Sequence, residues 1–232
     1  MAERPVFVPA TTGRMFVHEV PVEFRWHPGM APSQKKKNVV ELHNAAHARG
    51  LQTLLEVSSK SDREIGKRLS AFHQKVKLTD GSVHPLECVY QGSKVFANGG
   101  PFLDLFSVEP RVAKADERLK GSGRLIRFEL EGKKFPLYPK SIFYDWLYAN
   151  AIFPEREWLR RLGQIDGFTD IEFNPGKSIN CQARSCATFV ALDRLNLLGD
   201  CVGSSERFMQ VLLPDSLQQP HSNSDRKQSM FD

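Results

Sequence analysis

The chain has 232 residues, of which 41% are hydrophobic and 10% aromatic. This length and apolar content are enough to bury one core without disulfides or a structural metal, so we expect a single compact domain. The formal charge is +5, from 32 Lys and Arg against 27 Asp and Glu, an excess that favours a polyanionic partner without requiring one. No uncharged apolar run approaches the roughly 20 residues of a membrane-spanning helix, so no membrane partner is expected.

The cysteines and the start of the chain bear on its compartment. Cys88, Cys181, Cys186 and Cys201 form no paired CxxC motif, and no segment reads as a secretory signal. Reduced thiols and a cytoplasmic location are therefore expected. We expect neither a disulfide framework nor a metal site.

The first part of the chain predicts two strands and a helix. Apolar residues between prolines at 4–9 and alternating residues at 20–26 are typical of strands. Apolar residues at helical spacing predict a helix over 33–49, which Gly50 terminates. The lysines at 35–37 then lie in its first turn, where a solvated helix end explains them and a phosphate contact remains open.

Shorter elements follow. Residues 51–57 predict a strand that ends in a polar, serine-rich loop. A short helix is expected at 63–68, and the turn Asp80-Gly81 predicts that the stretch 69–78 enters a hairpin.

Helical patterns dominate the second half. They are expected at residues 85–96, 141–153, 155–165 and 181–197. Strands and helices mix along the whole chain, which predicts the α+β class. We expect one domain over residues 1–200, an extension at 201–213, and a disordered tail at 214–232, which is rich in Ser, Gln, Asn and charge.

One helix carries a polar stripe. If residues 85–96 are helical, Glu87, Tyr90, Gln91 and Lys94 fall at i, i+3, i+4 and i+7 on one face. The stripe combines an acid, a base, an amide and a phenol. A solvated helix face explains the same pattern, and a catalytic site is the alternative.

Two further segments are open to more than one interpretation. Residues 143–148 hold four aromatic side chains, which indicate core packing or, with Trp146, a stacking platform. Residues 166–180 place three carboxylates among turn-forming residues ahead of a helix. This segment is either a plain connection, with Ser178 or Asn180 capping the helix, or the lining of a site.

Several common enzyme classes lack their motifs here. The sequence contains no GxGxxG, P-loop, HExxH or GxSxG motif, which argues against dinucleotide-binding, phosphoryl-transfer, zincin and serine-hydrolase functions. His43 and His47 share a helix face, but without a third ligand a surface pair is the simpler interpretation.

Taken in order, the motifs resemble those of the NADAR family. They comprise Leu-Ser-Ala-Phe at 69–72, an acid followed by Tyr-Gln and Lys at 87–94, Tyr-Asp-Trp at 144–146, and an acidic loop at 170–173 before Asn180. The order is more specific than any single motif. The Arg-Pro-Val-Phe-Val-Pro, Pro-Gly-Met-Ala-Pro-Ser-Gln-Lys and Ser-Ile-Asn-Cys-Gln-Ala stretches are similar to the branch paired with DarT-type DNA ADP-ribosyltransferase toxins, and the resemblance covers about residues 3–198.

The sequence departs from the family pattern at three places. Ala71 stands where Asn is usual, Phe173 where the loop has Trp, and Asn174-Pro175 where Gly is usual. Stacking of a base at this loop is therefore expected to differ from that in other members.

The resemblance implies a single NADAR, or YbiA-like, domain that acts as an antitoxin. Its implied reaction is hydrolysis of the N-glycosidic bond between ADP-ribose and guanine in DNA, without a cofactor or metal, which reverses a DarT-type toxin. The implied partners are ADP-ribosylated DNA and the product ADP-ribose. Alternatives are an N-glycosidase for riboflavin-pathway or other nucleotide-like intermediates and a non-catalytic ADP-ribose-binding module.

Cleavage of a ribosyl C–N bond builds positive charge at the anomeric carbon, which a carboxylate stabilises. Glu87 and Asp170 are the candidate carboxylates. Lys94 is either a covalent catalyst, whose amine captures the opened sugar as a Schiff base, or a phosphate or Glu87 contact. The candidate substrate-binding residues are Ser58, Ser59, Lys60, Ser70, Phe72, Tyr90, Gln91, Trp146, Phe173 and Asn180.

Overall fold

The computed structural model describes residues 1–12, 15–29, 31–139, 141–161, 164–176 and 178–216. Strands and helices are mixed along these residues, with runs of each kind, which confirms the α+β class. No helix in this part of the chain is long and apolar enough to cross a bilayer. The four cysteines lie buried as free thiols.

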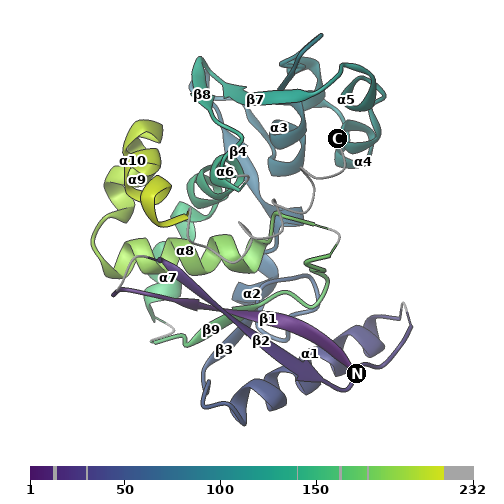
Figure 1. Ribbon diagram of the computed structural model, residues 1–232, viewed down its shortest axis with the longest axis vertical. Coiled ribbons are helices and arrows are strands. Elements are labelled where there is room, and N and C mark those ends of the chain that lie inside the picture. Colours follow the sequence, from purple (N-terminus) through teal and green to yellow (C-terminus); the bar gives the residue numbers. More distant parts are fainter. Residues whose placement is uncertain (13–14, 30, 140, 162–163, 177, 217–232) are drawn as a thin grey trace.

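The N-terminal part builds a four-stranded sheet in the order β2-β1-β9-β3. Its strands are β1 (Ala2–Pro9), β2 (Val17–Phe24), β3 (Leu54–Glu56) and β9 (Gly167–Thr169). β1 pairs antiparallel with β2 and β9, whereas β3 runs parallel to β9. Helix α1 (Pro32–His47) packs on this sheet beside β2, and α8 (Gln182–Arg194) lies against β1 and β9 (Figure 1).

A second, antiparallel sheet lies at the other end of the molecule (Figure 1). It has the order β6-β7-β8, from β6 (Lys94–Phe96), β7 (Leu125–Leu130) and β8 (Lys133–Phe135). The predicted hairpin is confirmed as β4 (Lys75–Lys77) and β5 (Val83–Pro85). Its turn depends on Gly81, whose φ of 87° favours glycine.

The helix α6 (Ile142–Ile152) lies in the core between the two sheets (Figure 1). Nine of its eleven residues are buried, so it is apolar on nearly every side rather than on one face. Phe143 stacks on Phe128 of β7 with ring centroids 4.7 Å apart. Asp145 accepts a hydrogen bond from Arg184 of α8 at 2.8 Å, and this buried ion pair joins the two helices.

Short elements complete the chain. They are α2 (Glu64–Arg68), η1 (Ala71–His73), α3 (Leu86–Gly92), η2 (Leu103–Ser107), α4 (Pro110–Ala115), α5 (Arg118–Gly121), η3 (Phe153–Glu155), α7 (Arg156–Arg161), α9 (Leu198–Gly203) and α10 (Ser205–Ser216).

Three expectations about local structure were wrong. The helix expected over 85–96 ends at Gly92, because the chain then pairs as β6 with β7. The helix expected over 155–165 is divided into η3 and α7 and ends at Arg161. The loop expected over 166–180 begins with the strand β9. Helix α10 ends at Ser216, and residues 217–232 of the tail expected to be disordered lie outside the described residues.

Candidate active site

A chain of hydrogen bonds joins the acid, amide and base of the polar stripe. Gln91 donates from its amide nitrogen to Glu87 at 2.8 Å and accepts from Lys94 Nζ at 2.6 Å. Lys94 is not on the helix, as the spacing suggested, but at the start of β6. The side chains meet nevertheless, because Ser93 is the C-cap of α3 and Lys94 follows it directly, next to the last turn of the helix.

Close packing fixes where α3 ends. A Cβ atom at Gly92 would lie 2.6 Å from the Phe106 ring and 2.7 Å from the Phe102 carbonyl oxygen, so only glycine fits there. The Ser93 carbonyl then accepts a hydrogen bond from Glu129 N at 2.8 Å. Backbone pairing with β7 therefore sets the position of Lys94.

The environment of Lys94 lowers the pKa of its amine from the ordinary value of a lysine. The side chain is half-buried, with Nζ 5.2 Å from the centroid of the Tyr90 ring. Burial lowers the pKa of Lys94, the Glu87 carboxylate opposes this shift, and Lys114 adds to it. An amine with a lowered pKa is a better nucleophile near neutral pH than an exposed lysine.

Tyr90 connects this helix to the loop before α8. Its hydroxyl accepts a hydrogen bond from Asn180 Nδ2 at 2.8 Å, and its ring meets Tyr144 edge-on at 5.5 Å. Burial raises the pKa of Tyr90 to about 12, so the phenol keeps its proton. The amide oxygen of Asn180 is buried and has no hydrogen-bond partner among the described residues.

Asp170 reaches the same region from the end of β9. Gln182, the first residue of α8, donates to the Asp170 carboxylate at 3.0 Å and accepts from Ala71 N at 2.6 Å. Gln182 thereby holds the Leu-Ser-Ala-Phe segment and the acidic loop together. Burial raises the pKa of Asp170 to about 6, although hydrogen bonds from Glu172 N and Gln182 oppose the shift.

Both candidate carboxylates affect the pKa of the buried Tyr144 phenol. Burial raises its pKa well above the usual value, and the charges of Cys181, Glu87 and Asp170 raise it further. Glu87 and Asp170, 83 positions apart in the sequence, therefore both influence one buried phenol.

Ser70 and Phe72 flank Ala71 on this site. The Ser70 hydroxyl is buried and lacks a hydrogen-bond partner within the described ranges, whereas the Phe72 ring is 82% exposed. Unpaired buried polar atoms are costly and are commonly satisfied by a ligand or water. Ser70 Oγ and Asn180 Oδ1 are thus available to bind a polar substrate.

A buried carboxyl group that the sequence motifs did not single out lies in the same part of the fold. Glu56, 1% exposed, accepts hydrogen bonds from the Ser58 hydroxyl at 2.5 Å, the Thr169 hydroxyl at 2.6 Å and Ile171 N at 3.0 Å. It joins the loop after β3 to the loop that carries Asp170. The sequence feature that could have identified Glu56 is a charged residue within the apolar run Leu54-Leu55-Glu56-Val57, because a carboxyl group in a buried strand needs dedicated hydrogen-bond partners.

The network around Glu56 is compatible with either protonation state. Burial, and then the charge of Asp170, raise the pKa of Glu56 to about 8. Two of its three partners are hydroxyl groups, which either donate or accept. His43 lies 2.9 Å from the Thr169 hydroxyl and remains neutral, because burial lowers its pKa to about 4.

A comparison with known families decides what these residues belong to. The profile described as DarT1-associated NADAR antitoxin matches residues 2–222. The chain belongs to this family. No curated protein matches the sequence.

In this NADAR chain the serine-rich loop is already hydrogen-bonded internally. Ser58 donates to Glu56, and its oxygen accepts from Lys60 N at 3.1 Å. Lys60 Nζ donates to the Ser59 hydroxyl at 2.9 Å. Ser59 and Lys60 are half-buried, so they lie nearer to solvent than Ser58 does. A role for this loop in binding diphosphate or ribose stays a prediction.

Two aromatic candidates lie in the core of the NADAR domain. Trp146 is 6% exposed and packs against Phe135 at 5.1 Å. Phe173 is buried and meets the Phe7 ring edge-on at 6.1 Å. The structure does not bring these two rings to the surface beside Phe72, and stacking of a base on them stays a prediction.

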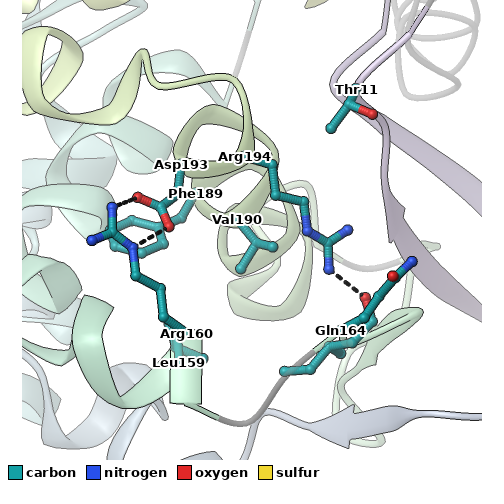
Figure 2. A pocket seen from close by; sticks show the side chains of 9 residues that line it. Thr11, Leu159, Arg160, Gln164, Phe189, Val190, Asp193 and Arg194 are labelled. Carbon is teal, nitrogen blue, oxygen red and sulfur yellow. Dashed lines mark hydrogen bonds and ion pairs between the residues drawn. The ribbon is translucent and has the colours of Figure 1, made fainter.

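A cavity of about 570 Å³ lies apart from the motif residues, between α7, α8 and the start of β9 (Figure 2). Its charged groups are already paired. Arg160 donates to Asp193 at 2.6 and 2.8 Å, and Arg194 donates to the Ile165 carbonyl at 2.8 Å. The candidate active site is instead defined by the family motifs, which meet around Lys94, Tyr90 and Asp170.

A metal ion would need several clustered ligands. Across the described ranges, no group of three His, Cys, Asp or Glu side chains has the geometry to hold one.

Proposed function

We propose that this NADAR antitoxin is a hydrolase that removes ADP-ribose from guanine bases in DNA by cleaving the N-glycosidic bond. The net reaction adds one water across that bond, giving unmodified guanine and free ADP-ribose. The hydrogen-bonded chain of Glu87, Gln91 and Lys94 supports this proposal, because Tyr90 of the same helix is bonded to Asn180, at the end of the segment that begins with Asp170. In the proposed reaction Lys94 is the nucleophilic amine, Asp170 the proton carrier and Glu87 the stabilising carboxylate.

Asp170 is suited to move the proton. A group with a pKa of about 6 is partly protonated near neutral pH and therefore serves as an acid and then as a base. In the proposed reaction it protonates the departing guanine nitrogen as the C–N bond breaks. It later takes a proton from the attacking water.

Lys94 is suited to form the covalent intermediate. The C1–O4′ bond opens as O4′ takes a proton from Asp170 and the lone pair of the guanine nitrogen forms a C1=N iminium. The neutral amine of Lys94 adds to C1 and returns a proton to Asp170, which passes it to the guanine nitrogen as the C1–N bond to guanine breaks and a Schiff base to Lys94 forms. Water then adds to this imine, the C–N bond to Lys94 breaks, and ADP-ribose leaves with its aldehyde while the amine is restored. Glu87 stabilises the positive charge that develops during these steps.

The direct test is release of ADP-ribose from an oligonucleotide that contains ADP-ribosyl-guanine, followed by mass spectrometry. Wild type is expected to release it, and Glu87→Gln and Lys94→Ala variants are expected to lose most of this activity. Lys120→Ala is a matched control, because Lys120 is exposed on α5. Borohydride during turnover is expected to add the sugar mass to wild type and not to Lys94→Ala.

The same assay separates the competing functions. Binding of the modified oligonucleotide without cleavage would make the protein an ADP-ribose reader. Neither binding nor cleavage would favour a glycosidase for riboflavin-pathway or other small nucleotide-like molecules. If Lys94→Ala still cleaves the substrate and no borohydride adduct forms, the protein is a hydrolase that does not use a Schiff base.

A further inference from the structure

Phe72 is an aromatic side chain that the fold leaves in solvent. It is 82% exposed and lies in the 3-10 turn η1. The residue before it, Ala71, donates its backbone N–H to Gln182, which in turn binds Asp170. The turn that carries Phe72 is therefore tied to the segment of Asp170. Burial of a phenylalanine ring is worth about 2 kcal/mol, and the exposed ring of this turn is available to an external partner.

The surface around Phe72 is strongly basic. The segment 60–77 contains six lysines and arginines and two acids, so it carries four of the five net positive charges of the chain. Lys75 and Lys77 point outward from β4, and neither forms an ion pair with another described residue. Positive charge concentrated beside a reactive site favours a polyanion over a neutral or cationic partner.

Part of this charge is balanced within the fold. A cavity of about 290 Å³ beside Phe72 is lined by Lys67, Arg68, His73, Gln74 and two acids. Arg68 pairs with Glu155, and Lys67 lies 3.6 Å from Glu64. The Arg68–Glu155 pair joins α2 to η3, the Lys67–Glu64 pair lies within α2, and the cations of β4 are left to meet solvent or a partner.

We propose that Phe72 stacks on the nucleobase next to the modified guanine, while the lysines of β4 contact the neighbouring phosphates of the same DNA strand. This inference rests on the proposed function, because it assigns the DNA-contacting surface of that site. An aromatic ring stacks on any base, since every base has a π-face, and flanking cations follow the backbone. The stacked ring would also replace the contact that the neighbouring base loses when the modified guanine leaves the stack and enters the site.

The test compares two substrates and two kinds of variant. Phe72→Ala is expected to lower kcat/KM about tenfold or more for an ADP-ribosylated oligonucleotide. It is expected to leave kcat/KM for ADP-ribosyl-guanosine, which has no neighbouring base, within about twofold. Phe72→Trp is expected to restore most of the loss. Val40→Ala, which removes an exposed apolar side chain from α1, is the control.

The phosphate contacts have their own control. A Lys75→Ala/Lys77→Ala double variant is expected to reduce the salt dependence of oligonucleotide binding by about one to two units of log–log slope. The Lys120→Ala/Lys134→Ala variant removes the same charge from two exposed positions on α5 and β8 and is expected to leave the slope unchanged. Equal effects of the two double variants would overturn the assignment of this surface.

Three outcomes would decide the role of Phe72. An equal loss on both substrates would mean that Phe72 shapes the reactive site and does not contact the adjacent base. No loss on either would remove it from substrate binding. If wild type cleaves neither substrate, the proposed function fails, and 2-aminopurine placed beside the modified guanine still reports stacking. Fluorescence quenching by wild type that Phe72→Ala abolishes would support the DNA contact, and its absence would overturn it.

Discussion

Two carboxyl groups near the site have opposite surroundings. Glu56 is enclosed, with three hydrogen-bond donors directed at it. Glu87 is half-buried and contacts Lys94 only through the amide of Gln91. An acid held by several fixed donors positions the segments that supply them, whereas a partly solvated acid beside an amine remains free to react. Under the proposed function, we expect Glu56 to hold the site together and the Glu87 chain to perform the chemistry.

The largest expected effect comes from the reactive side of this comparison. Lys94→Arg keeps a positive charge but provides no neutral amine, because a guanidinium stays protonated. We expect release of ADP-ribose to fall about a thousandfold in single-turnover assays, with the melting temperature close to that of wild type. Near-normal activity of Lys94→Arg would show that Lys94 acts through its charge alone.

Substitution of the enclosed carboxyl group, Glu56, is expected to affect stability more than activity. Glu56→Ala leaves two hydroxyl groups and the Ile171 N–H without their acceptor, so we expect a loss of about 3 kcal/mol in the free energy of unfolding. Glu56→Gln retains an acceptor oxygen and is expected to lose less. Urea denaturation measures both changes. If Glu56→Gln were fully stable but as inactive as Lys94→Arg, Glu56 would belong to the chemistry after all.

A pH dependence sharpens the same distinction. Because the folded-state pKa of Glu56 is raised to about 8, the unfolded chain releases this proton at lower pH, and stability falls as the pH rises towards 8. His43, with its pKa lowered to about 4, changes stability in the opposite direction, but only below about pH 6.5. Asp170 has largely ionised above its pKa of about 6.

The useful window is therefore pH 6.5 to 8. There we expect wild type to lose about 1–2 kcal/mol of unfolding free energy. Glu56→Gln removes the titrating group and is expected to show a flatter profile in the same urea series. Parallel profiles for the two proteins would mean that Glu56 is ionised throughout this range.

The smallest expected effect comes from Tyr90, which joins the helix of Glu87 to Asn180 in the loop before α8. Tyr90→Phe removes the acceptor of the Asn180 hydrogen bond and preserves the ring contacts with Tyr144 and Phe128. We expect a loss of about 1 kcal/mol in stability, measured by denaturant unfolding, because a single partly buried hydrogen bond is lost. A much larger loss would indicate that the phenol also holds another part of the site.

Local patterns in the sequence predicted the elements that depend on local contacts. Helical spacing gave α1, α6 and α8, alternation gave β1 and β2, and an Asp-Gly turn gave the β4–β5 hairpin. The family motifs also predicted that Glu87, Gln91 and Lys94 are related, although their helical placement was wrong for Lys94.

The tertiary structure decided the contacts between distant segments. Strand β9 has three residues and is defined by pairing with β1 and β3, more than 100 positions away. The link from Ala71 through Gln182 to Asp170, and the enclosure of Glu56, likewise join parts of the chain that share no local pattern. Residue type and spacing thus determined which side chains were available for chemistry. Only long-range pairing, whose energy no short window of sequence contains, decided which of them are buried and which meet.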